Sequence, residues 1–304
     1  MKIINLYWHK TNQSHGNFGD ELNHFIVSKL TGSKINQIII PSKGFNYIYR
    51  ALSYIYKKKS TKDVLKLFKQ FFVNDFVVGI GSIIAIPKNP RAKVWGSGII
   101  KKDDIINKSN FYAVRGSYTQ KRLVELNLIA PETIGDPALL LPLVYEVDVK
   151  KKYCLGIIPH YIHYNSINNN LKHDSILIIN LLDPIEKIIN EIVSCERTIS
   201  TSLHGIIVSH AYKIPCLWYV FSGKNLAGDN IKFYDYFSSV DIEEYSPFSL
   251  NIVDFNLEKI IKLFKIHSQN TLINNNLIEI QQQLIKVAPF PILDKYKSKP
   301  LLKK

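Results

Sequence analysis

The stretch ISTSLHGIIVSHAY, residues 199–212, joins the end of an apolar strand to the start of an apolar helix. From Leu203 onward, apolar residues recur every three or four positions, which predicts a helix over 204–212. The preceding residues, 197–201, predict a strand. A strand that leads directly into a helix is the repeating unit of α/β domains with a parallel sheet.

The amino end of this predicted helix places a histidine where an anion could bind. Ser202 or Thr201 is expected to cap the helix, and His204 then lies in its first turn. Unpaired backbone N–H groups and the positive end of the helix dipole favour a phosphate or carboxylate at this position. His204 is therefore a candidate acid or charged group in an anion site. The alternative is a histidine that only starts the helix and hydrogen-bonds to the backbone.

The same alternation of strand and helix extends on both sides of this stretch. The sequence predicts further strands over 3–8, 35–40, 76–80, 93–95, 111–114, 154–158, 176–181 and 214–219, and helices over 21–30, 117–126 and 183–194. Because the strands are continuously apolar instead of alternating, both faces of each sheet should be covered. We therefore expect an α/β fold of two doubly wound, Rossmann-like domains that face a central cleft.

A polar, lysine-rich segment, VYEVDVKKKY at residues 144–153, is the best candidate for an interdomain linker. It divides the chain into an N-terminal domain over 1–148 and a C-terminal domain over 153–256. Residues 257–304 are expected to form C-terminal helices and a basic tail that can pack back across the cleft.

Composition places the chain among folded globular proteins, with 304 residues, 46% hydrophobic and 21% charged. Its three cysteines, Cys154, Cys195 and Cys216, are widely spaced and fit neither a disulfide framework nor a zinc cluster. No metal or other cofactor is expected. The short apolar run at the start and the lack of about 18 consecutive apolar residues predict a cytoplasmic protein.

The formal net charge of +14 is concentrated in 57–62, in 150–152 and in the terminal KYKSKPLLKK. Such an excess attracts polyanions, anionic lipid surfaces and phosphorylated small molecules without distinguishing among them. Because the lysines are not interleaved with aromatic residues in a recognised module, no specific nucleic-acid partner is expected. A lysine-rich solvated surface without a partner is the plain alternative.

Glycine and polar residues follow two strands of the first half. In HGNFGDELN, Gly19 permits a close backbone turn, Asn17 offers a polar side chain, and Asp20 is expected to cap the following helix. In VVGIGSII, Gly81 allows a ligand to approach the backbone and Ser82 adds a hydroxyl. Neither glycine pattern completes a dinucleotide fingerprint, so NAD is not predicted.

Three cationic or titratable residues complete the candidate set. Arg115, in AVRGSYTQKRL, follows a strand and precedes Ser117, which is a predicted helix cap. Its guanidinium could clamp a carboxylate or phosphate. The alternative is a structural salt bridge with Asp136. His160 follows the first strand of the second half and is expected to share a pocket with His204. Lys224, in FSGKN, is a further cation.

Taken in order, the segments of this chain resemble those of the polysaccharide pyruvyl transferases. The resemblance rests on NFGDELN, GIGS, WGSGI, VRGSYT, IGDPALLLP, IPHY, STSLHG, AYKIPCLWY and GKNLAGDNIKFYDYF. It implies a two-domain fold like that of GT-B glycosyltransferases. It also implies transfer of the pyruvyl group of phosphoenolpyruvate onto two hydroxyls of a sugar in a cell-surface polysaccharide precursor, with formation of a ketal.

The resemblance also implies roles for the candidate residues. His204 would act as the acid or activate the phosphate, Arg115 would clamp the donor, and Asn17, Asp20 or His160 would contact the acceptor or act as the base. Ser202 stands where many members have arginine, so anion binding would depend on backbone amides, Arg115 and Lys224. Acceptors carried on a lipid diphosphate imply peripheral contact with the inner face of an anionic membrane. A nucleotide-sugar glycosyltransferase and a non-catalytic polyanion-binding protein are the alternative functions.

Overall fold

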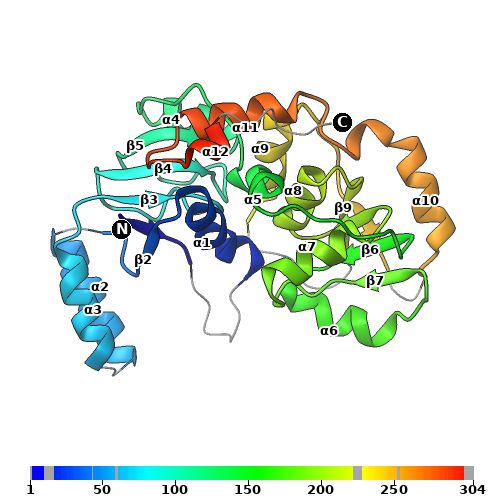
Figure 1. Ribbon diagram of the computed structural model, residues 1–304, viewed down its shortest axis with the longest axis horizontal. Coiled ribbons are helices and arrows are strands. Elements are labelled where there is room, and N and C mark those ends of the chain that lie inside the picture. Colours follow the sequence, from blue (N-terminus) through cyan, green and yellow to red (C-terminus); the bar gives the residue numbers. More distant parts are fainter. Residues whose placement is uncertain are drawn as a thin grey trace.

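Two parallel β-sheets of five strands each form the centre of the two halves of the molecule (Figure 1). This computed structural model describes residues 2–9, 17–42, 44–58, 61–221, 228–251 and 254–297. Both sheets are parallel throughout, as the continuously apolar strands predicted.

The first sheet has the strand order β2-β1-β3-β4-β5. It is formed by β1 (Ile3–Tyr7), β2 (Lys34–Ile38), β3 (Phe76–Val78), β4 (Ala92–Ser97) and β5 (Asn110–Val114). Helices α1 (Phe18–Thr31) and α4 (Ser117–Glu125) belong to this half. Every residue of β3 is buried, which agrees with a strand that is covered on both faces.

The second sheet has the order β10-β9-β8-β6-β7, which repeats the strand order of the first when the strands are counted from β6. Its strands are β6 (Leu155–Ile158), β7 (Ile176–Ile178), β8 (Thr198–Ser200), β9 (Cys216–Phe221) and β10 (Phe248–Leu250). Its helices are α6 (Tyr161–Asn170), α7 (Ile185–Val193), α8 (Leu203–Ala211) and α9 (Ile231–Ser239). In both sheets the order reverses between the first and third strands, where ligands of doubly wound folds bind.

The chain crosses between the halves twice. Residues 145–152 carry no helix or strand and connect α5 (Leu141–Val144) to the second sheet. After α10 (Leu257–Ile266), helices α11 (Leu277–Lys286) and α12 (Asp294–Lys297) return to the first half. There the Trp95 indole N–H of β4 donates to the Leu284 carbonyl at 2.9 Å, and the Trp95 ring meets Phe290 edge to face.

One hydrophobic core runs through the contact between the halves. It contains Leu22 of α1, Leu139 of the short helix η1 (Pro137–Leu140), Ile206 of α8 and Leu284 of α11, all fully buried or nearly so. Figure 1 shows α1, α5 and α8 between the two sheets. The carboxyl edges of the sheets therefore lie beside a packed interface, which fixes the position of the loops around them.

Two predicted helix caps are wrong. Helix α1 begins at Phe18 with Asn17 at the N-cap position, so Asp20 lies inside the first turn instead of capping the helix. Helix α4 begins at Ser117 itself, after Gly116. The helices themselves were predicted closely, since the predicted 21–30 lies within α1 and the predicted 117–126 exceeds α4 by one residue.

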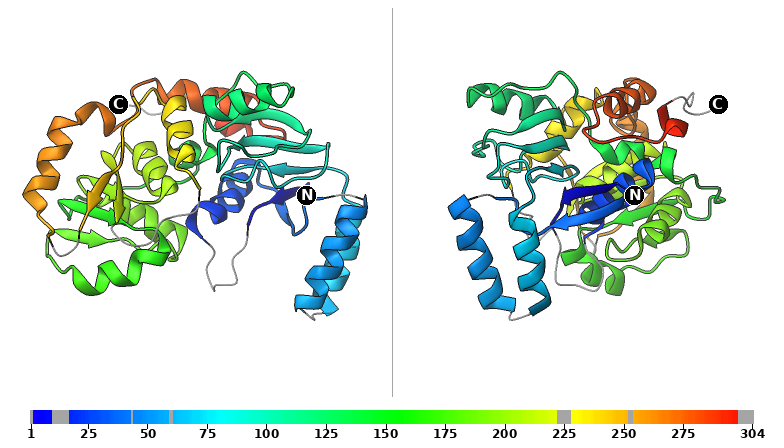
Figure 2. Two further views of the ribbon diagram at one scale, coloured as in Figure 1. Left: turned by 180° about the vertical axis from the view of Figure 1, so that it is seen from behind. Right: turned by 60° about the vertical axis from the view of Figure 1, so that its left-hand side comes forward.

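A helical hairpin, α2 (Gly44–Lys58) and α3 (Thr61–Phe71), connects β2 to β3. The sequence did not predict it. Figure 1 and both views of Figure 2 show the hairpin standing away from the body of the molecule. No helix among the described residues is both long and apolar enough to cross a bilayer.

Candidate active site

His204 lies where the two halves meet. It is the second residue of α8, which follows β8, and Ser202 occupies the N-cap position, one of the two residues predicted for it. A Cβ atom added to Gly19 would lie 2.6 Å from Cε1 of His204. The imidazole of the second half thus rests against the backbone at the amino end of α1 in the first half.

Asp136 lies on the other side of this imidazole. Its Oδ2 is 3.8 Å from Nε2 of His204, while its Oδ1 accepts a hydrogen bond from the Ala138 N–H and caps η1. Both Oδ2 and Nε2 are buried and have no hydrogen-bond partner among the described residues. Since buried polar atoms are nearly always paired in folded proteins, these two unpaired atoms mark the pair as a candidate functional site.

Burial sets the charge state of this pair. It lowers the pKa of His204 to about 3, and the positive charges of Arg115 and Lys232 act in the same direction. It raises the pKa of Asp136 to about 6, against the opposing effects of the Ala138 N–H and Arg115. At pH 7 the free protein therefore holds a neutral imidazole beside a mostly ionised carboxylate.

Arg115 is fully buried, and three of its N–H groups are engaged. Its Nε donates to Oδ2 of Asp235 at 2.9 Å, its Nη1 to Oγ of Ser82 at 2.7 Å, and its Nη2 to the Ile99 carbonyl at 2.6 Å. Its ion-pair partner is therefore Asp235 of α9, not Asp136. The guanidinium holds loops of the first half together, and its charge also acts on His204.

Asp20 faces the loop that follows β3. Its Oδ1 would be 3.9 Å from a Cβ added to Gly81, whose φ of +120° suits glycine alone. Asn23 of α1 fixes this approach, because its side chain donates to the Ile80 carbonyl and accepts from the Ile80 N–H, both at 2.8 Å. Burial raises the pKa of Asp20 to about 7, with Asn17 opposing the shift.

His160 lies at the same switch point of the second sheet as His204, since it follows β6 and His204 follows β8. Strands β6 and β8 are paired, and the His160 N–H donates to the Thr201 hydroxyl at 2.8 Å. Its buried Nδ1 has no hydrogen-bond partner among the described residues. Burial lowers the pKa of His160 to about 4, and the charge of Lys232 contributes. Lys232 thus lies within electrostatic range of both His160 and His204.

Lys232 is the site residue that the sequence analysis missed. It is the second residue of α9, and burial lowers its pKa to about 8, with Arg115 adding to the shift. Its motif, DNIKFYDYF, was among the segments quoted for the family resemblance, but nothing in that motif distinguishes this lysine from the surface lysines. The predicted cation Lys224 lies outside the described residues.

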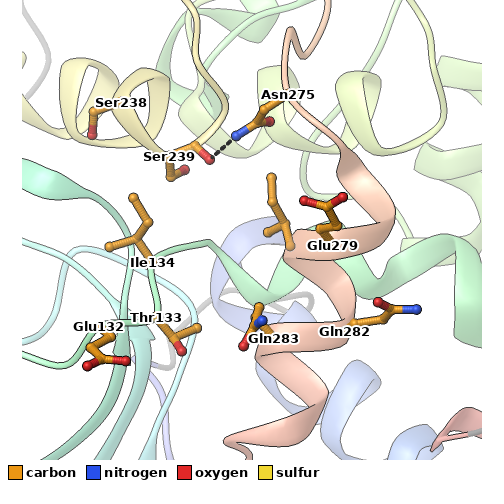
Figure 3. A pocket seen from close by; sticks show the side chains of 10 residues that line it. Glu132, Thr133, Ile134, Ser238, Ser239, Asn275, Glu279, Gln282 and Gln283 are labelled. Carbon is orange, nitrogen blue, oxygen red and sulfur yellow. Dashed lines mark hydrogen bonds between the residues drawn. The ribbon is translucent and has the colours of Figure 1, made fainter.

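A cavity of about 530 Å³ lies elsewhere, between α9, α11 and the loop after α4 (Figure 3). Its lining includes two carboxylates, Glu132 and Glu279, and the amide side chains of Asn275, Gln282 and Gln283. None of the cations described above lines it. Its chemistry therefore does not suit a phosphorylated donor.

This arrangement, with a histidine and a carboxylate between two parallel-sheet halves and buried cations close by, defines the candidate site of a two-domain α/β protein. The sequence model of the polysaccharide pyruvyl transferase family matches residues 17–223, more than half of the chain. The chain belongs to this family. The match includes Gly19, Asp20, Arg115, Asp136 and His204 and ends before Lys232.

Two similar proteins carry less information about function. The uncharacterized protein L143 of Acanthamoeba polyphaga mimivirus is 28% identical over 282 residues, which cover 89% of this chain and 88% of that protein. The Escherichia coli heptosyltransferase WaaC, solved with ADP, matches with 8% identity and a TM-score of 0.37, over 88% of this chain and 100% of that chain.

Proposed function

We propose that this protein transfers the pyruvyl group of phosphoenolpyruvate onto two hydroxyls of a sugar in a cell-surface polysaccharide precursor, forming a cyclic ketal and inorganic phosphate. Membership of the family supports a pyruvyl transferase of polysaccharide biosynthesis. The observation that carries the proposal is the placement of His204, which lies between Gly19 and Asp136 of the first half with its Nε2 unpaired.

The donor requires positive charge, because phosphoenolpyruvate carries a carboxylate and a phosphate. Lys232 and Arg115 supply charge close to His204. Ser202 makes no side-chain capping bond, so its hydroxyl and the unpaired N–H groups of α8 can donate to the phosphate. We assign Lys232 the direct contact, because three N–H groups of Arg115 already have protein partners. Lys224 is retained as a further candidate cation for the donor.

The first half of the reaction adds one hydroxyl to the donor. A proton is delivered to the methylene carbon of phosphoenolpyruvate, and the C=C electron pair forms the new C–H bond. The resulting oxocarbenium-like carbon is captured by a sugar hydroxyl, which loses its proton to a base. One proton enters and one leaves, so this step yields a phosphorylated adduct without net proton transfer.

The second half expels phosphate and closes the ring. The C–O bond to the phosphate breaks, a second hydroxyl of the same sugar attacks the carbon, and the proton of that hydroxyl departs with the phosphate. Hydrogen-bond donors aimed at the leaving phosphate stabilise the charge that develops on it. The amino end of α8 with Ser202, and the ammonium of Lys232, have this role.

His204 and Asp20 divide the proton transfers. His204 is neutral in the free protein, but a bound phosphate and carboxylate raise its pKa and reverse the effect of the neighbouring cations. The donor therefore creates the imidazolium that protonates it. Asp20, whose pKa of about 7 leaves a large ionised fraction at neutral pH, accepts the proton of the sugar hydroxyl. Asn17 and His160 contact the acceptor, and Gly19, Gly81 and Ser82 line its path.

The test is phosphate release from phosphoenolpyruvate by the purified protein, with and without sugar diols, and mass analysis of the sugar product. We expect release that depends on the acceptor, together with a sugar that gains one pyruvyl ketal. His204→Ala should lower the rate at least about a hundredfold, the scale of a positioned proton donor.

The matched control is His173→Ala, which removes an exposed histidine from the loop before β7, at the opposite edge of the same sheet. It should retain the wild-type rate. Nucleoside diphosphate release from a sugar nucleotide, without use of phosphoenolpyruvate, would instead establish a glycosyltransferase.

A further inference from the structure

The exposed apolar side chains of this protein are concentrated on the α2–α3 hairpin. Of the seventeen large hydrophobic side chains exposed among the described residues, nine belong to residues 44–72. They are Ile48, Tyr49, Leu52, Tyr56, Val64, Leu65, Phe68, Phe71 and Phe72. Monomeric proteins rarely expose such a cluster without a binding function.

The apolar stripe of the hairpin is wider than the part that holds its helices together, and its exposed part forms an outer apolar face. In α2, Tyr47, Ala51 and Ile55 belong to a small internal cluster with Leu67 of α3. The residues one position further along, Ile48, Leu52 and Tyr56, are exposed, and 82% of Tyr56 is accessible to solvent. The outer face is therefore not required for pairing of the two helices.

The charge of the hairpin indicates what covers this outer face. Residues 44–72 contain seven basic residues and one acidic residue, Asp63. A second copy of the hairpin would bring like charges together, which opposes self-association. An anionic surface with an apolar interior complements both features, and a bilayer with acidic lipids is such a surface.

We propose that the α2–α3 hairpin docks the protein on anionic membranes, with its outer apolar side chains at the boundary between headgroups and acyl chains and its net positive charge attracted to the lipid phosphates. The longer helix has 15 residues and is about 22 Å long, less than the roughly 30 Å of a bilayer core. The hairpin therefore lies in the interface and does not span the bilayer.

The base of the hairpin is electrostatically connected to the candidate site. Arg50 of α2 lowers the pKa of Tyr7, at the end of β1, while Asp20 raises it; burial dominates and brings it to about 12. Docking would bring the carboxyl edge of the first sheet close to the lipid headgroups. If the proposed function holds, this position suits an acceptor attached to a lipid, but docking itself does not require catalysis.

The experiment is flotation of the full-length protein with vesicles of phosphatidylcholine alone or with roughly 30 mol% phosphatidylglycerol. The test variant is Leu52→Ser/Phe68→Ser/Phe72→Ser. The matched control is Ile105→Ser/Val124→Ser/Ile129→Ser, which removes three exposed apolar side chains of the same half outside the hairpin. Circular dichroism and thermal melting establish that each variant is folded.

We expect wild type and control to float with the acidic vesicles, and the hairpin variant to bind at least about tenfold more weakly. Raising NaCl from about 0.1 M to about 1 M should weaken wild-type binding.

Equal binding by hairpin variant and control overturns the proposal, as does a wild type that stays in the bottom fraction. A wild-type dimer that the hairpin variant dissociates would show that a second copy covers the face. Phosphate release with a soluble sugar acceptor tests the enzyme separately, so failure of either proposal can be distinguished.

Discussion

At the scale of single residues, the absence of a side chain at Gly19 leaves room for the His204 imidazole. The imidazole of His204 occupies the space where a Cβ would be. Gly19 lies inside α1 with an ordinary helical backbone, so alanine is acceptable to the helix itself and is intrinsically favoured there by about 1 kcal/mol.

Gly19→Ala should therefore leave the protein folded but displace His204. We expect acceptor-dependent phosphate release to fall at least about tenfold, because a misplaced proton donor loses its alignment with the substrate. Ser28→Ala, at the other end of α1, serves as the control. Unchanged turnover in Gly19→Ala would show that His204 does not need its observed position.

Replacement of Asp20 by asparagine should raise the stability of the protein and lower its activity. Its folded-state pKa of about 7 lies above the 3.8 that is usual for an aspartate, so the folded protein binds the proton more tightly than the unfolded chain does. Stability contributed by this group is full below about pH 4, decreases as the pH rises, and is lost above about pH 7.

Asp20→Asn removes this cost, so its advantage in unfolding free energy over wild type should grow from about pH 4 to a plateau above about pH 7. The expected plateau is on the order of 2–4 kcal/mol. Urea unfolding at several pH values measures the stability. The same variant should release phosphate more slowly than wild type, because it lacks the proposed base. A difference that does not vary with pH would contradict the raised pKa.

At the scale of elements, Asp235 ties α9 to the first half. It accepts from Arg115, and also from the Thr119 backbone N–H at 2.8 Å and the Thr119 hydroxyl at 2.7 Å. All three residues are fully buried. Removing the charge of Asp235 leaves the Arg115 guanidinium without its counter-ion, which costs far more than one neutral hydrogen bond.

We expect Asp235→Asn to lower the unfolding free energy by about 3–5 kcal/mol. The double variant Arg115→Met/Asp235→Leu should recover part of this loss, because no uncompensated charge remains. Its phosphate release should stay low if the charge of Arg115 supports donor binding. Near wild-type stability in Asp235→Asn, within about 0.5 kcal/mol, would mean that the pair does not secure α9.

The elements that could be predicted are those whose pattern is local. Continuous apolar runs gave the parallel strands, and the apolar periodicity after Ser202 gave α8 to within one residue of its observed start. The switch point between β6 and β8, which brings His160 and His204 to adjacent strand ends, also follows from a doubly wound order.

The contacts that could not be predicted join distant parts of the chain. Arg115 and Asp235 are 120 residues apart, and the sequence analysis considered only the nearer Asp136 as a salt-bridge partner. Lys232 is one lysine among many until burial distinguishes it. The sequence analysis assigned no element to the hairpin, although apolar residues recur at helical spacing in both of its helices. Nothing in that spacing shows that the two helices pair with each other and stand away from the sheet.

At the scale of the whole molecule, the two halves behave as parts of one packed body. Their shared core and the return of α11 and α12 connect them through contacts from both ends of the chain. His204 and Asp136 therefore meet at a fixed interface, whereas domains joined by a linker alone would be expected to move relative to one another. The site depends on this interface as much as on its own residues.

The seating of α11 on the first sheet also has a consequence for biosynthesis. Trp95 and the carbonyl of Leu139 receive their partners, Leu284 and Gln281, from a segment that is translated more than 140 residues later. Until α11 has been synthesised, the part of the first half that α11 covers remains exposed to solvent. Nascent chains released before residue 277 should thus be preferred chaperone clients, since domains of large proteins are aggregation-prone until their apolar surfaces are closed.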